Sequence, residues 1–204
     1  MKIGLLVLAL AVGLIAGCAS GPVANVATYD FGLSPTRRDD IRHLPAPLSV
    51  ASVAAPPWLN SNEIIYRLNY QDAARARAYS LSQWVAPPAA LLTQRLRQQL
   101  DFAGTITRPN EGFSSRYLLR TELEEFSQIF DTADSSRALV RIRAALVDVA
   151  TKTSLAQRTF SVERLVPAPN AAGAVTSLGQ ATDGAIEALL EWLVIEMNQV
   201  TGAQ

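Results

Sequence analysis

Few side chains in this 204-residue chain are of a type and spacing that could do acid–base or covalent chemistry. The best candidates are Glu122 and Glu124, which would lie on one face of a predicted strand as a carboxylate pair. Arginines are expected beside them on the sheet, so a solvated face with cross-strand charge pairs is the favoured interpretation: Arg120, Arg141 and Arg143. The only histidine, His43, has no ligand partner at metal-binding spacing and is expected to be an exposed loop residue. We predict no catalytic site, no metal and no cofactor.

The most specific chemical signal is the only cysteine, Cys18, at the end of an apolar N-terminal run. Lys2 precedes the run Ile3–Ile15, which at about 13 residues is too short to span a bilayer. A basic start, an apolar core and small residues before a cleavage site are typical of a secretory signal peptide. The sequence Ile15-Ala16-Gly17-Cys18 fits a lipoprotein signal peptidase, which would cut before Cys18. The alternative is an ordinary secretory peptide with an accidental cysteine.

Lipidation of Cys18 would add a diacylglycerol through the thiol and an acyl chain on the new amine, and so hold the protein on a membrane. It would also consume the only thiol, which leaves no cysteine nucleophile and no disulfide. Ala19 and Ser20 follow the cysteine, with no aspartate to signal retention in the inner membrane. We expect the outer membrane, with the protein facing the periplasm.

Composition and the positions of proline and charged residues indicate a tether followed by one domain. The formal net charge is +0, so nothing favours a nucleic-acid partner, because such binding depends on basic patches. Prolines and charges mark residues 18–46 as a lipidated tether and lead-in, after the signal peptide at 1–17. We assign residues 47–204 to a single α+β domain.

Hydrophobic periodicity predicts the elements of that domain. Short strands are expected before the first helix, at 28–33, 48–54, 63–70 and 79–85. Three strands with one apolar face each follow, at 117–126, 137–149 and 155–164, and a bulge or a strand end is expected at Glu125-Phe126. We predict a mostly antiparallel sheet with one face covered by two amphipathic helices, at about 88–101 and 174–200.

The three tryptophans are possible partner contacts, each with a structural alternative. Trp58 follows two prolines in a loop, where an exposed aromatic side chain often contacts a partner, or it covers the edge of the core. Trp84 precedes Pro87-Pro88 and is expected to fix a corner between strand and helix. Trp192 flanks the apolar stripe of the last helix, where it covers the sheet edge or forms a subunit interface.

A fixed order of short patterns gives the chain a resemblance to a known family. After the Ala-Gly-Cys of the signal peptide come a lead-in at Tyr29–Leu33 and a short strand at 47–54. Further patterns follow: EIIYR at 63–67, WVAPPAALLTQRL at 84–96 and LVRIRAALVDVATKTSLAQRTFS at 139–161. Together they resemble the ABC-type transport auxiliary lipoproteins, the PqiC-like proteins. The sequence departs from the pattern at Gln83, where arginine is expected, and at Thr151-Lys152-Thr153, where a glycine-containing turn is commoner.

The resemblance implies a non-catalytic outer-membrane lipoprotein that works with an MCE-domain lipid-transport system. In such systems an inner-membrane ABC transporter or integral membrane protein is paired with MCE rings that cross the periplasm. The lipoprotein would dock the far end of that conduit, and because related members form rings, a homo-oligomer is expected. Only Cys18 carries over a chemical role from the family. Two alternatives are a lipid carrier with an apolar phospholipid pocket between sheet and helices, and an adaptor of another envelope assembly.

Overall fold

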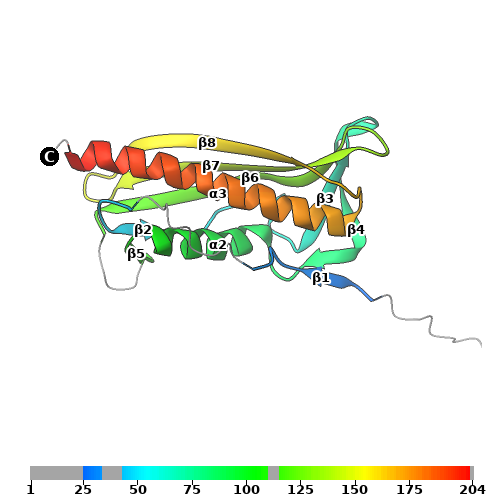
Figure 1. The fold of residues 1–204 in the computed structure, drawn as a ribbon, viewed down its shortest axis with the longest axis horizontal. Helices are drawn as coiled ribbons and strands as arrows, with labels where there is room; N and C mark the ends of the chain where they lie inside the picture. Colours follow the sequence, from blue (N-terminus) through cyan, green and yellow to red (C-terminus); the bar gives the residue numbers. More distant parts are fainter. Residues whose placement is uncertain (1–24, 34–42, 110–114, 203–204) are drawn as a thin grey trace, which may run out of the picture.

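The computed structural model describes residues 25–33, 43–109 and 115–202. The predicted signal peptide and Cys18 lie outside these ranges. The described chain forms one eight-stranded mixed sheet with two long helices on the same face (Figure 1). This is the α+β architecture that the periodicity predicts.

Three long antiparallel strands make the body of the sheet: β6 (Tyr117–Phe130), β7 (Ser136–Asp148) and β8 (Thr153–Leu165). Their alternating residues turn one apolar row toward the helices, including Leu119, Leu123 and Ile142, each with 0% exposure. The register between β6 and β7 shifts between Leu123 and Glu125 while β6 continues to Phe130, so of the two alternatives at this point the structure has a bulge and not a strand end. β6 and β8 are longer than their predicted ranges, whereas β7 has the predicted length and begins and ends one residue earlier.

The remaining strands line the other edge of β6 and attach mostly by short parallel pairings. β2 (Leu48–Val50) and β3 (Glu63–Leu68) pair with opposite halves of β6, and η1 (Pro57–Leu59) lies between them. β5 (Ile106–Thr107) pairs with β2, and β1 (Ala27–Tyr29) pairs with β4 (Asp72–Trp84). β4 in turn pairs antiparallel with β3.

Among the shorter strands, the boundaries of β1, β2 and β4 differ most from the predictions. β1 ends at Tyr29 rather than at 33. β2 ends at Val50 rather than at 54, although Ala54 still forms an isolated parallel bridge to Glu122 of β6. β4 begins at Asp72 rather than Tyr79, because hairpin pairing with β3 extends the strand through the alanine- and arginine-rich stretch 72–78. Tertiary pairing there overrides the weak strand propensity of alanine.

Both predicted helices form and cover the predicted face. α2 (Pro88–Ala103) begins at a proline, whose fixed φ suits the first turn, and stops before Gly104. α3 (Ala171–Gly202) begins three residues earlier than predicted, because Asn170 accepts a hydrogen bond from the Gly173 amide at 2.9 Å. The buried stripes of the two helices join the inward sheet residues in one core.

Candidate functional site

The segment just before the domain, residues 25–33, is fastened to the fold and is here called the lead-in segment. Its strand β1 pairs with the end of β4, with Tyr29 opposite Trp84. Phe31 then turns its ring into the core, 5.5 Å from the Trp84 ring and 5.6 Å from the Phe126 ring. Trp84 and Phe126 also meet at 5.6 Å, so three aromatic rings hold the lead-in segment against the sheet.

A buried arginine of α2 binds the backbone of the lead-in segment through hydrogen bonds. The Arg95 guanidinium donates hydrogen bonds to three successive carbonyl oxygens, those of Phe31 at 2.6 Å, Gly32 at 2.9 Å and Leu33 at 3.0 Å. Arg95 is only 3% exposed, and a buried cation needs such partners to offset its desolvation. The lead-in segment is therefore held in two ways, by its strand pairing with β4 and by hydrogen bonds from a buried side chain.

Asp183 of α3 is the acidic partner of this arginine. Its Oδ1 lies 3.7 Å from Nη1 of Arg95, and its side chain keeps 31% exposure. Burial raises the pKa of the Asp183 carboxyl above its ordinary value, and the charge of Arg95 opposes part of that rise. One arginine thus connects α2, α3 and the lead-in segment.

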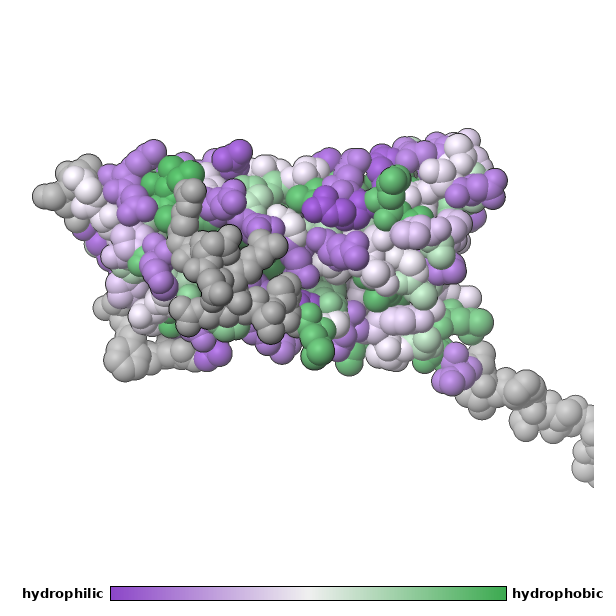
Figure 2. All heavy atoms as spheres, in the orientation of Figure 1, coloured by the Kyte–Doolittle hydropathy of each residue, from purple (hydrophilic) through white to green (hydrophobic). Residues whose placement is uncertain are grey.

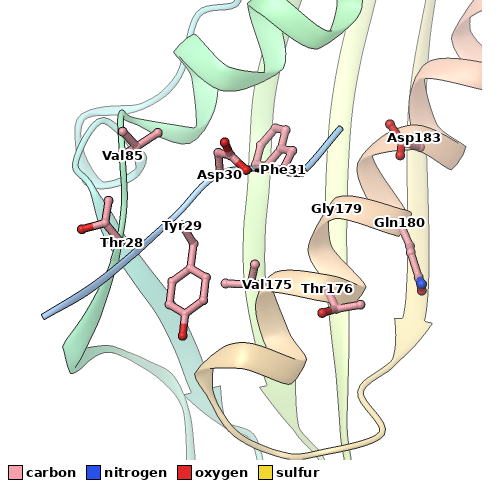
Figure 3. Close-up of a pocket in the computed structure, with 11 residues that line it drawn as sticks. Thr28, Tyr29, Asp30, Phe31, Val85, Val175, Thr176, Gly179, Gln180 and Asp183 are labelled. Atoms are coloured by element: carbon pink, nitrogen blue, oxygen red, sulfur yellow. Dashed lines mark hydrogen bonds between the residues drawn. The ribbon is translucent and has the colours of Figure 1, made fainter. Parts of the chain in front are cut away.

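An open groove of about 600 Å³ lies between the lead-in segment and the first half of α3 (Figure 3). Its lining mixes aromatic and aliphatic groups with polar ones: Tyr29, Phe31, Val85, Val175, Thr28, Asp30, Thr176, Gln180 and Asp183. Both carboxyls serve local structure, because Asp30 accepts a hydrogen bond from the Gly32 amide at 2.7 Å and Asp183 pairs with Arg95. The groove walls are too polar to match an acyl chain along their length.

Of the predicted carboxylate pair, Glu122 lies on the outer face of the sheet, away from this groove, whereas Glu124 is half-buried in the bulge and has no residue opposite it in the register. Glu122 is exposed and stands opposite Arg143 in the register, while Glu125 stands opposite Arg141. Arg143 donates a hydrogen bond to Gln157 of β8 at 2.9 Å. The cross-strand arrangement of acids and arginines follows the interpretation favoured from the sequence, a charged outer face.

The three tryptophans separate into two core residues and one surface residue. Trp84 has 0% exposure and Trp192 has 5%, with its ring 5.8 Å from that of Phe160, so the suggestion that these two contact a partner is corrected in favour of the structural alternatives. Trp58 is 41% exposed, with the Arg67 guanidinium 5.2 Å above its ring. Only Trp58 remains available to a partner.

The other predicted positions add no chemical site. His43 is exposed, as expected, and within the described ranges no three metal-binding side chains gather at one place. Arg95 is a functional residue that the sequence alone does not identify, because an arginine in an amphipathic helix is ordinarily expected to be exposed. Its three acceptors lie more than 60 residues upstream, so no local pattern could have indicated its burial.

The match to a family model covers most of the domain and the part of this site from Phe31 onward. A model described as the ABC-type transport auxiliary lipoprotein component matches residues 31–189, from Phe31 into α3. The chain belongs to this family. Membership makes it an auxiliary lipoprotein of an ABC-type transport system, of a class anchored in the cell envelope. Neither helix of the described ranges combines the length and apolarity of a membrane span.

Solved structures share the fold at low sequence identity. A Xanthomonas campestris protein described as belonging to the DUF330 family superposes with a TM-score of 0.76 at 19% identity, covering 86% of this chain and 99% of its own. A second, described as an uncharacterized protein, superposes with a TM-score of 0.61 at 15% identity, covering 83% of this chain and 99% of its own. The chain matches none of the curated proteins with which it was compared.

Proposed function

We propose that this auxiliary lipoprotein is a non-catalytic docking subunit of an MCE-type lipid-transport system, anchored in the outer membrane through lipidated Cys18 and facing the periplasm. The observation that carries the proposal is the lead-in segment. It begins a few residues after Cys18 and is held by β1 pairing, by the ring of Phe31 and by Arg95. A domain fastened this closely to its lipid suits a fixed docking platform at a membrane surface.

The outer face of the sheet supports a non-catalytic role. Glu122 stands opposite Arg143 in the register, and Glu125 lies 3.7 Å from the Arg67 guanidinium, so these two carboxylates have cationic neighbours. The work of the protein would then be binding: it receives the periplasmic end of the conduit through which an inner-membrane ABC transporter or integral membrane subunit moves phospholipid. That transport would support the integrity of the envelope.

Assembly into a homo-oligomer is part of the proposal. β8 is 13 residues long and pairs only with β7 in the described sheet, so its other edge offers backbone donors and acceptors. A second copy could add to that edge. Native mass spectrometry of the lipidated protein in detergent would show a closed oligomer if the proposal holds, and a single copy if it does not.

A rescue experiment in cells tests the functional proposal. Loss of the protein should make the outer membrane permeable to bulky hydrophobic antibiotics, and wild-type protein should restore the barrier. Cys18→Ser should fail to restore it, because the docking platform leaves the membrane. The double variant Glu122→Gln/Glu124→Gln should restore it fully, since no carboxylate chemistry is involved. A normal barrier in cells without the protein, or full rescue by Cys18→Ser, would contradict the proposal.

The carrier alternative makes a different prediction. A carrier would retain phospholipid after mild purification, which native mass spectrometry would detect as a bound mass beyond that of the covalent acyl chains. The docking proposal predicts none.

A further inference from the structure

An apolar patch lies on the surface where the described chain begins. It consists of Val26, Leu81 and Val85, which are 41%, 54% and 56% exposed, and is here called the β1–β4 patch. The register that pairs Ala27 with Ser82 places Val26 beside Leu81. Val85 follows the buried Trp84 and donates its amide to the Tyr29 carbonyl at 2.7 Å, so it belongs to the same strand pair. Figure 2 shows apolar surface at this end of the molecule, next to the start of the described chain.

The patch stays close to the predicted lipid anchor in every conformation. Val26 comes eight positions after Cys18, and an extended chain of that length spans at most about 28 Å. A group held this near a membrane meets it at a high effective concentration. A contact that would be too weak to recruit the protein from solution can therefore form once the acyl chains are inserted.

The charges around the patch favour a neutral, apolar contact. Residues 25–33 and 78–87 contain no lysine or arginine. The charged residues that adjoin the patch in the strand register are acidic: Asp30 follows β1, and Glu63 stands opposite Gln83. Anionic lipids therefore add no attraction, and screening by salt should not weaken the contact.

The size of the patch argues against a second copy of the chain as its occupant. A stable protein interface buries about 800 Å² on each partner, which is far more than three partly exposed side chains provide. A membrane surface needs no such area, because the anchor has already brought it close.

We propose that the β1–β4 patch rests on the lipid surface in which Cys18 is anchored and so fixes the orientation of the domain. The inference depends on the anchorage in the proposed function. The C-terminal end of α3 lies at the opposite end of the long axis from β1 (Figure 1). With 32 residues at 1.5 Å each, α3 extends about 48 Å. That far end, which includes the β7–β8 turn, then faces the periplasm and the incoming conduit.

The single cysteine makes a site-specific test possible. Lipidation converts the Cys18 thiol to a thioether, so Leu81→Cys carries the only free thiol of the mature protein and accepts one environment-sensitive fluorophore. The lipidated variant is reconstituted into phosphatidylcholine vesicles with and without lipids that carry a nitroxide quencher in the upper acyl chain. The expected result is a blue shift of the emission together with loss of emission when the quenching lipid is present. Both effects should be unchanged in high salt.

Two further variants serve as controls. Val149→Cys places the same fluorophore on an exposed valine in the β7–β8 turn, at the far end, and its emission should be neither shifted nor quenched. Val26→Glu/Val85→Glu added to labelled Leu81→Cys should abolish the quenching. Both valines are surface residues, so thermal unfolding should stay within a few degrees of the parent, which shows that the fold is kept.

The outcomes separate this inference from the proposed function. If the protein floats with the vesicles but the fluorophore at position 81 is not quenched, the orientation is wrong and the anchorage stands. A blue shift without quenching would mean that protein, a second copy, covers the patch, which also overturns the inference. Failure to float would overturn the anchorage and the orientation together.

Discussion

The guanidinium of Arg95 lies 3.7 Å from the carboxylate of Asp183 and also binds three backbone carbonyls of the lead-in segment. One side chain of α2 therefore joins the long C-terminal helix to the segment that leads from the lipid anchor. Through this contact, a pull on the anchor is transmitted to both helices rather than to a free tail.

Replacing Arg95 with methionine should release the lead-in segment. The change keeps most of the apolar stem but leaves the carbonyls of residues 31–33 without their donor and Asp183 without its cation. Loss of one partner of a buried pair costs about 3 kcal/mol of unfolding free energy. Denaturant unfolding measures this loss, and hydrogen exchange should show faster exchange at residues 25–33. The exposed Arg120→Met is the control, with a change within about 0.5 kcal/mol. An unchanged hydrogen-exchange rate at residues 25–33 in Arg95→Met would contradict the conclusion that Arg95 holds this segment in place.

The raised pKa of Asp183 gives a signed pH dependence. A carboxyl whose pKa is higher in the folded state than in the unfolded state binds its proton more tightly when folded, so its contribution to stability is greatest at low pH. That contribution is lost as the pH rises from the ordinary aspartate range, roughly 4, through the raised folded value. Asp183→Asn removes this titration. The unfolding free energy of wild type minus that of the variant should therefore fall with rising pH across this window. A difference that rises with pH would mean that the charge of Arg95 outweighs the burial of Asp183.

Truncating the tryptophans should separate core from surface. Trp84→Ala removes a fully buried ring that contacts Phe31 and Phe126, and should lower the unfolding free energy by about 4 kcal/mol. Trp58→Ala removes a half-exposed ring under Arg67 and should cost less than about 1 kcal/mol. Equal losses measured by denaturant unfolding would contradict the burial of Trp84. A variant of Trp58 that is stable but weakened in rescue would identify this residue as a partner contact.

The β7–β8 turn contains a residue with a strained backbone conformation, and a substitution should relieve that strain. Lys152 has a φ of +56°, in the left-handed region that favours glycine, at the turn where the sequence departs from the family pattern. A non-glycine residue in this conformation costs about 1 kcal/mol of folding free energy. Glycine avoids that cost, but its larger entropy in the unfolded state offsets part of the gain. Lys152→Gly should therefore raise the midpoint of thermal unfolding by a few degrees at most. The exposed Lys152→Ala, which keeps the strain, is the control and should not raise it.

Local sequence patterns predicted most of the helices and strands. The features that they did not predict depend on contacts between residues distant in sequence. The alternation of apolar residues from Tyr117 onward gave the meander and its bulge, because each strand buries one face. The parallel pairing of β2 and β3 with two halves of β6 could not be predicted from either short strand, because its register depends on contacts that are distant in sequence. Arg95 shows the same limit at the site: its burial depends on carbonyls of the lead-in segment, which are distant in sequence.

The most direct test of the account is a crosslinked pull-down of the lipidated protein from intact membranes, followed by mass spectrometry. We predict that wild type recovers an MCE-domain protein together with inner-membrane subunits of its ABC-type system. Cys18→Ser should lose both, because the unanchored platform no longer meets the conduit. Recovery of the protein alone, or of subunits from an unrelated envelope assembly, would contradict the docking function.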